Sequence, residues 1–221
     1  MKIYLQLLIL IFALQANAQN DSVLLTKNFK FEDGIYLTLQ DFQQNKPNYT
    51  WNEVSTNLAT SHEGFIAQVE AIKIDGHSLD LQQLWGICIG GIPYIRLSKG
   101  EVTEAATVFA GLRVRGKICY FGYQQAVTEM QLVKAYNPLT GRAFRQGKIP
   151  VEKTMEYHFL LNFQTGQVAP FTKNNFLAWI EDDQQLWTTV QELSSQEAQD
   201  KLFKCLLIYV DRNTVHLPFT N

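Results

Sequence analysis

The hydrophobic pattern of the chain changes its period once, close to Pro170, and this change constrains the fold more than any other feature. Before Pro170, apolar residues alternate with polar ones over short runs. Between Thr107 and Arg115, for example, every second residue from Val108 to Val114 is apolar. After Pro170, apolar residues recur three or four positions apart, which is typical of helices. A β-rich part is therefore followed by a helical part.

Eight short runs before Pro170 are predicted to be strands. No helical pattern separates the strands in the middle of the chain, and antiparallel neighbours need only short turns. We therefore expect an α+β fold, with an antiparallel β-meander (a sheet or partly open barrel of about six to eight strands) followed by two to three C-terminal helices. The predicted strands are Gly34–Leu39, Gly64–Ile74, Leu84–Ile89, Ile92–Leu97, Thr107–Arg115, Lys117–Tyr123, Met130–Tyr136 and Tyr157–Phe163.

Several local signals mark where elements begin and end. Thr38 can cap a short helix that follows the first strand, and Pro47 ends it. Gly90-Gly91 predicts a hairpin turn, and residues 137–141 (NPLTG) predict another turn. Ser194 and Glu197 form an S-x-x-E capping box at the start of the last helix.

The first eighteen residues have the plan of a secretory signal peptide. Lys2 precedes a mostly apolar run, and small residues lead to a cleavage point between Ala18 and Gln19. The apolar run is shorter than the roughly 20 residues of a membrane span, and no run after it reaches that length. We expect residues 19–170 to form the β-rich region and residues 171–221 a helical segment packed on the sheet, in one domain. The expected location is periplasmic or secreted.

The weak net charge of −2 gives no broad attraction to nucleic acid or anionic lipid. Gly34-Ile35-Tyr36 and Tyr94-Ile95 superficially suggest a GIY-YIG endonuclease. The two motifs are almost sixty residues apart here, and Arg96 stands where the second glycine belongs. Ile and Tyr are good strand formers, so both segments are better explained as strands. We expect no nucleic-acid partner.

Cysteine and histidine usage gives little support for a metal site or cofactor. Export would place Cys88, Cys119 and Cys205 in a disulfide-permissive compartment, and Cys88 with Cys119 is the more plausible pair. The favoured alternative is that all three are buried as small apolar residues. His62-Glu63 begins an H-E-x-x-H motif, but Ile66 replaces the second ligand.

Other motifs fall short of a catalytic or anion-binding pattern. Gly76-His77-Ser78 lacks the second glycine of a nucleophile elbow, because Asp80 takes its place. Asp182 and Asp183 point about 100° apart on a helix, so they are better helix-end residues than a catalytic pair. Two basic stretches are expected to be solvated faces, with anion binding as the less favoured interpretation. They are Arg113, Arg115 and Lys117, and Arg142, Arg145 and Lys148.

Three segments carry a resemblance to a known group. They are GIYLTLQDFQQNKP (34–47), LWGICIGGIPYIRL (84–97) and VAPFTKNNFLAWIEDDQQLW (168–187). Together with the signal peptide they resemble a group of uncharacterised exported proteins of Bacteroidetes-type bacteria. The resemblance covers most of the chain after residue 18 and implies export. It implies no activity and no functional residues.

Two functional hypotheses follow. The first is an exported, non-catalytic protein that binds a partner protein or an envelope component, without a cofactor. The second is a small periplasmic or secreted hydrolase whose site is assembled from distant residues, with Ser78, His62, His158 and paired carboxylates available. Convergence of those side chains in a pocket would favour the hydrolase, and their scatter would favour the binding protein.

Overall fold

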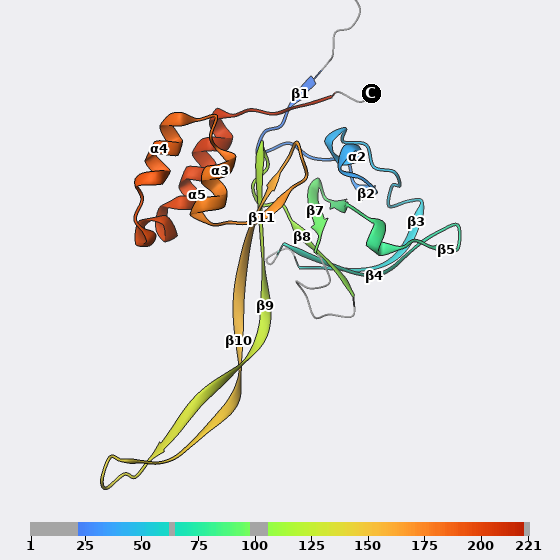
Figure 1. Cartoon of the computed structure of the whole chain (residues 1–221). Helices are drawn as coiled ribbons and strands as arrows, with labels where there is room; N and C mark the ends of the chain where they lie inside the picture. Colours follow the sequence, from blue (N-terminus) through green and yellow to red (C-terminus); the bar gives the residue numbers. More distant parts are fainter. Residues whose placement is uncertain (1–21, 62–64, 98–105, 219–221) are drawn as a thin grey trace, which may run out of the picture.

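The computed structural model describes residues 22–61, 65–97 and 106–218, and its α+β fold confirms the predicted class (Figure 1). The predicted cleavage point, Ala18 and Gln19, and also His62 lie outside the described residues. The strands are β1 (Ser22–Leu24), β2 (Gly34–Tyr36), β3 (Val54–Ser61), β4 (Ile66–Ile74), β5 (His77–Ser78), β6 (Gly86–Ile89), β7 (Ile92–Arg96), β8 (Thr107–Gly111), β9 (Ile118–Tyr136), β10 (Ala143–Asn162), β11 (Val168–Pro170) and β12 (His216–Pro218). The helices are α2 (Leu39–Gln43), the 3-10 helix η1 (Leu81–Gln83), α3 (Lys173–Trp179), α4 (Gln184–Glu192) and α5 (Ser195–Arg212).

The larger sheet is antiparallel and curled, with strand order β2-β6-β7-β8-β4-β3 and with β5 paired to β4. Tyr36, Cys88 and Val108 face the core cluster that also contains Phe121, so several of the sheet's strands are buried on both faces. Ile35, Val69, Ile87 and Phe109 from four of them pack into one apolar cluster. The Gly90-Gly91 turn joins β6 to β7, as predicted, and both glycines have positive φ. The sheet confirms the predicted antiparallel, partly open arrangement, but it is not a simple meander, because β2 lies beside β6 and β8 beside β4. The predicted strands from residue 117 onward belong to a second sheet.

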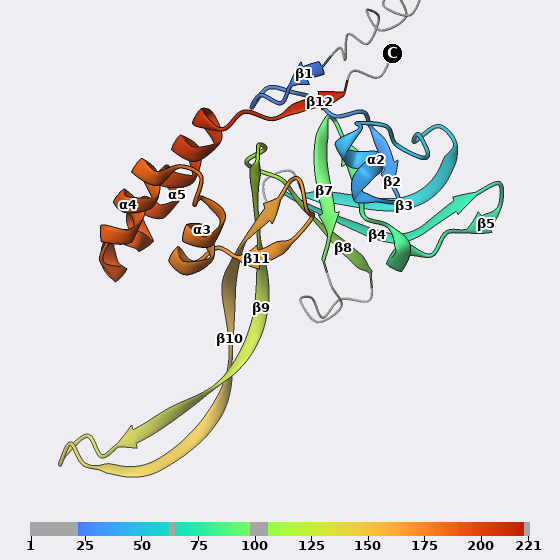
Figure 2. The ribbon, with the colours of Figure 1, turned by 45° about the horizontal axis from the view of Figure 1, so that its top comes forward.

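A second sheet, β9-β10-β11, lies between the curled sheet and the C-terminal helices (Figure 2). Successive residues of a strand point to opposite faces, so each face of this sheet contacts a different layer. Phe121 and Leu161 join the core cluster that contains Phe42 and Tyr36 from the N-terminal part. Three side chains on the opposite face, Ile118, Tyr120 and Leu160, pack with residues of α3, α4 and α5.

Side-chain caps define the helix starts that the sequence predicts. Thr38 caps α2, and a full capping box forms with Asp41. Ser194 and Glu197 form the second capping box, at the start of α5. Each box supplies acceptors to backbone N–H groups that have no partner within the helix. The last helix thus begins where Ser194 predicts, and the helical segment packs on the sheet through its apolar residues.

The two ends of the described chain lie side by side. β1 pairs antiparallel with β12, with Val23 opposite Leu217. Beyond the pair, the Leu25 N–H donates to the Val215 carbonyl oxygen at 2.8 Å. The N-terminal segment is thereby held to the end of the helical segment.

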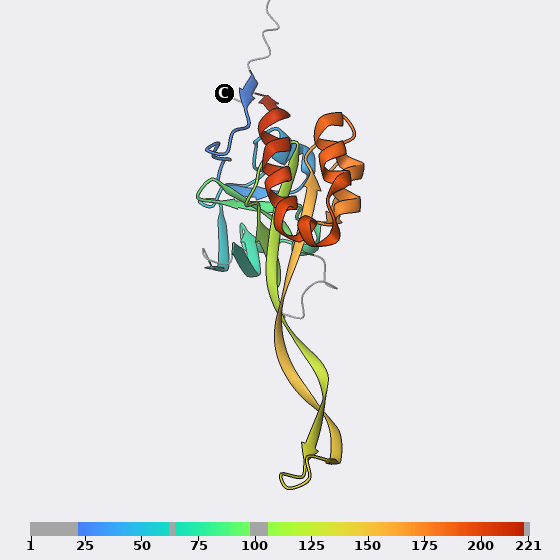
Figure 3. The ribbon, with the colours of Figure 1, turned by 90° about the vertical axis from the view of Figure 1, so that its left-hand side faces the viewer.

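The prediction was wrong about the lengths of the strands in the middle of the chain. Lys117–Tyr123 and Met130–Tyr136 were expected to be two short strands, yet both belong to β9, which has 19 residues. Tyr157–Phe163 is only the end of β10, which has 20 residues. β9 and β10 pair along their whole lengths and form one hairpin that extends well beyond both the curled sheet and the helices (Figure 3).

Candidate interaction site

Of the serine and histidine residues that the hydrolase hypothesis names, the structure describes Ser78 and His158, and these two lie in different sheets. Ser78 is exposed in β5, at the far end of the curled sheet. His158 lies in β10, in the other sheet. No group of three or more His, Cys, Asp or Glu side chains suited to a metal ion occurs among the described residues. Among the described residues, Ser78 and His158 therefore do not form a shared site.

His158 belongs to a small polar cluster at the base of the long hairpin. Its Nδ1 lies 2.7 Å from the Tyr120 hydroxyl, and its Nε2 lies 3.7 Å from a Glu156 carboxylate oxygen. Burial raises the pKa of the Tyr120 hydroxyl, so this group stays protonated near neutral pH. The Tyr120 ring also contacts Phe171 and Phe203 edge-on. These contacts connect the base of the hairpin to the helical layer.

The Gly34-Ile35-Tyr36 segment is part of the core. Ile35 and Tyr36 have no solvent exposure. The Tyr36 hydroxyl donates to the Glu32 carbonyl oxygen at 2.7 Å, and burial raises its pKa further above the usual range. A catalytic tyrosine must reach a substrate, and this one does not reach the surface. The strand interpretation of the segment is thus the one that the packing supports.

All three cysteines are free, buried thiols, and Cys88 is not bonded to Cys119. The Cys119 thiol donates to the Gly116 carbonyl oxygen at 3.4 Å, and burial raises its pKa to about 12. Burial likewise raises the pKa of the Cys88 thiol. A thiol with a raised pKa carries little thiolate, which is the reactive form. These cysteines therefore have the environment of structural residues.

The Gly90-Gly91 turn already has an anion in place. The Asp33 carboxylate accepts hydrogen bonds from the N–H groups of Gly90, at 3.1 Å, and Gly91, at 2.7 Å. A phosphate would need the same two donors. The carboxylate fills that position, and the turn is structural.

Two residues of the first basic stretch, Arg115 and Lys117, make contacts within the fold, which corrects their interpretation as part of a solvated face, whereas Arg113 is exposed. Arg115 donates to the carbonyl oxygens of Phe29 and Lys27, each at 2.8 Å. Lys117 pairs with Asp182, whose other carboxylate oxygen accepts from Tyr209. The role of Asp182 is therefore to connect β9 to the helical segment.

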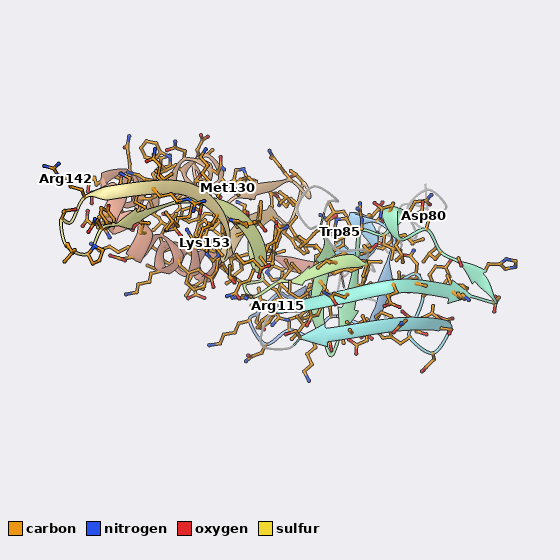
Figure 4. The ribbon with its side chains drawn as sticks, turned by 90° about the horizontal axis from the view of Figure 1, so that it is seen from below. Asp80, Trp85, Arg115, Met130, Arg142 and Lys153 are labelled. Carbon is orange, nitrogen blue, oxygen red and sulfur yellow. The ribbon has the colours of Figure 1, made fainter. Side chains whose placement is uncertain are left out.

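The second basic stretch lies at the free end of the long hairpin. We call residues 124–156, beyond the cross-strand pair Tyr123–Tyr157, the arm. Residues 130–150 are its tip, and residues 124–129 with 151–156 are its neck. Arg142 lies at the end of the arm with its side chain pointing away from the molecule (Figure 4).

The tip carries positive charge without any negative charge. It contains Lys134, Arg142, Arg145 and Lys148 and no Asp or Glu, so its formal charge is +4. The whole chain carries −2, so the rest of it carries −6 (−2 minus +4). All four side chains are exposed. The ion pairs among the described residues involve Lys117, His158, Lys201 and Arg212 and none of the tip cations.

Apolar side chains are exposed between these cations on both faces of the ribbon. Cross-strand partners share a face, so the pair Met130–Pro150 lies on one face with Leu132, and the pair Gln131–Ile149 lies on the other. Leu132 is 51% exposed and Ile149 47%. Among the tip side chains that the structure describes, the exposed large apolar ones are Met130, Leu132, Val133, Tyr136, Leu139 and Ile149.

The turn at the end of the tip is well ordered by its own hydrogen bonds. The Gly141 N–H donates to the Asn137 carbonyl oxygen at 2.8 Å, and the Asn137 N–H donates to the Arg142 carbonyl oxygen at 2.9 Å. The Asn137 side chain accepts from the Leu139 N–H at 2.9 Å. Leu139 is 93% exposed at this position. The turn therefore holds a leucine at the extreme end of the arm.

The tip was only partly visible in the sequence. The basic residues 142, 145 and 148 and the turn at 137–141 were recognised. The distance of these residues from the body depends on the lengths of β9 and β10, and the sequence did not predict those lengths. A signal was present: residues 130–150 contain no acidic residue in a chain with 21 of them.

Comparisons with known proteins return no relative: no family model, no curated protein and no solved structure matches the chain. Within the described residues, no helix is long and apolar enough to cross a membrane. The function must therefore be argued from the geometry of the chain itself.

Proposed function

We propose that the chain is an exported, non-catalytic binding protein that contacts a partner or an envelope component through the tip of its arm. The observation that carries the proposal is the exposure of six large apolar side chains and four unpaired cations on one projecting ribbon. Export rests on the signal-peptide pattern of residues 1–18.

The physical cost of the arm supports a binding role. A two-stranded ribbon that packs on nothing else is marginally stable in water, and exposed apolar clusters favour unwanted association. The buried part of the hairpin ends at Tyr123 and Leu160, so the described side chains of the arm add nothing to the core. An arm of this kind is best explained by a contact that its apolar residues make with something else.

Site-specific photo-crosslinking in the native host tests the proposal. A photoreactive residue replaces Leu132 in the tip, and in a matched control it replaces Lys73, which is also exposed on a strand but lies in the curled sheet. We expect crosslinked products from position 132 that position 73 does not give. Equal labelling at the two positions, or none at position 132, would contradict the proposal.

A shortened-arm variant provides the complementary test. Residues 127–153 are replaced by Asn-Gly, which suits a two-residue hairpin turn between the cross-strand partners Ala126 and Thr154. We expect the shortened chain to be absent from the host-cell fraction that contains the intact chain. An unchanged distribution would show that the arm does not determine where the protein binds.

A further inference from the structure

We infer that the partner of the tip is an anionic lipid surface, into whose interface the tip inserts. The inference rests on the proposed function, because it identifies the partner of the same site. It depends on three features of the described tip: its charge, the two-sided exposure of its apolar residues, and the change of charge at the neck.

The charge of the tip is complementary to a negatively charged surface. Four cations in 21 residues, with no carboxylate among them, give a uniformly positive segment. Each Lys or Arg near an anionic membrane surface strengthens binding about fivefold. The weak net charge of the whole chain conceals this attraction, because the −6 elsewhere cancels it. The sequence-based expectation of no pull on anionic lipid therefore does not apply to the tip.

The apolar residues favour lipid over a protein surface. A flat protein surface that docks on a ribbon covers one of its faces and leaves the other in water. In the tip, Leu132 faces one way and Ile149 the other, and Leu139 is exposed at the end. Only surroundings that enclose the ribbon bury all three. A lipid interface does so, and it also solvates the basic side chains at the headgroups.

The neck limits how far the arm can enter. It contains Glu129, Glu152 and Glu156 against a single cation, Lys153, for a charge of −2. An anionic surface attracts the tip and repels the neck, so insertion stops near the Met130–Pro150 pair. The ribbon also bends in its distal half, so the tip can lie along a surface while the body stays clear of it (Figures 1 and 2).

The open edges of the ribbon argue against a partner that adds a strand. Strand addition uses a continuous row of free backbone N–H and carbonyl groups. Pro150 removes one N–H from β10, and charged side chains flank it at Lys148 and Glu152. These features are typical of strand edges that do not pair.

Vesicle flotation with the full chain tests the inference. The vesicles are phosphatidylcholine alone, or phosphatidylcholine and phosphatidylglycerol in equal amounts. The tip variant is R142Q/R145Q/K148Q. Its control, K46Q/K73Q/K204Q, removes the same charge from exposed body positions. A second tip variant, L132S/L139S, removes apolar area without changing charge. Any lipid binding by residues 1–18 is common to all variants and cancels in the comparison.

We expect the wild-type chain to bind the anionic vesicles more strongly than the neutral ones. Loss of three tip cations should lower the partition roughly 100-fold, at about fivefold per residue. Loss of the two leucines should lower it roughly tenfold. The body variant should bind like the wild type.

Two results would overturn the inference. One is that the wild type binds both vesicle types equally or binds neither. The other is that the body variant loses as much binding as the tip variant. If crosslinking at position 132 then captures a protein, the lipid inference fails while the proposed function stands. If position 132 gives no crosslinks and anionic vesicles are bound equally by wild type and both tip variants, both fail.

Discussion

At the scale of single residues, Gly34 shows how one backbone position constrains the first strand. Its φ is +150°, and a Cβ there would lie 2.3 Å from the Tyr49 carbonyl oxygen. Gly147, in the arm, has no neighbour within 4 Å of the same point. We expect Gly34→Ala to lower the free energy of unfolding by about 2–4 kcal/mol, and Gly147→Ala to change it by less than about 0.5 kcal/mol. Urea unfolding of both variants measures this, and similar losses would contradict it.

Glu197 makes a pH-dependent contribution to the stability of α5. Hydrogen bonds from Lys201 and from the Ser194 backbone and hydroxyl lower its pKa from 4.5 to about 2. A carboxyl group with a lowered pKa stabilises the folded state above its unfolded-state pKa, and this contribution is lost as the pH falls to the folded-state value. We expect the stability difference between the wild type and Glu197→Gln to be constant above pH 4.5 and to shrink between pH 4.5 and 2. A difference that grows on acidification would rule this out.

At the scale of elements, the hairpin divides into a structural base and an arm. The base supplies Phe121 and Tyr120 to the two core clusters on its opposite faces. None of the arm side chains that the structure describes is buried. We therefore expect replacement of residues 127–153 by Asn-Gly to shift the melting temperature by only a few degrees. A matched excision of residues 122–158, which removes the stacked pair Tyr123–Tyr157, should lower it by much more. Circular dichroism melts compare the two, and equal shifts would refute the division.

The same division explains which elements the sequence predicted. Residues 107–115 show an alternating pattern and residues 84–97 two short apolar runs, because these strands pack in the core. In the neck, Gln124, Thr128 and Glu129 carry no such pattern, because neither face packs on a core. Periodicity reports burial, so a strand without a buried face leaves no period-two signal.

Helix caps depend on local side chains, and the caps at Thr38 and Ser194 were therefore predicted correctly. The partners of Arg115 are carbonyl oxygens 24 to 88 positions away in the chain, and no local pattern could identify them.

At the scale of the whole molecule, the two halves of the chain on either side of the arm are interlocked. The bases of β9 and β10 pair, and β1 pairs with β12. A cut at the end of the arm therefore separates the chain covalently but removes none of these contacts. Arg142 is an exposed cation between the tip turn and the start of β10. At this position the backbone is not part of the paired ladder. Proteases cut such turns in preference to paired strands.

We expect limited trypsin digestion to cut first after Arg142, giving two fragments on a denaturing gel that still elute together as one species on native gel filtration. If the tip inserts in lipid, vesicles that contain phosphatidylglycerol should slow this cut, and vesicles of phosphatidylcholine alone should not. Cutting at Lys73 or Lys204 in the body serves as the internal control, because both are exposed but distant from the arm, and their rates should be the same with either vesicle. Separation of the fragments under native conditions would show that the pairing of the hairpin base and of the termini does not hold the halves together.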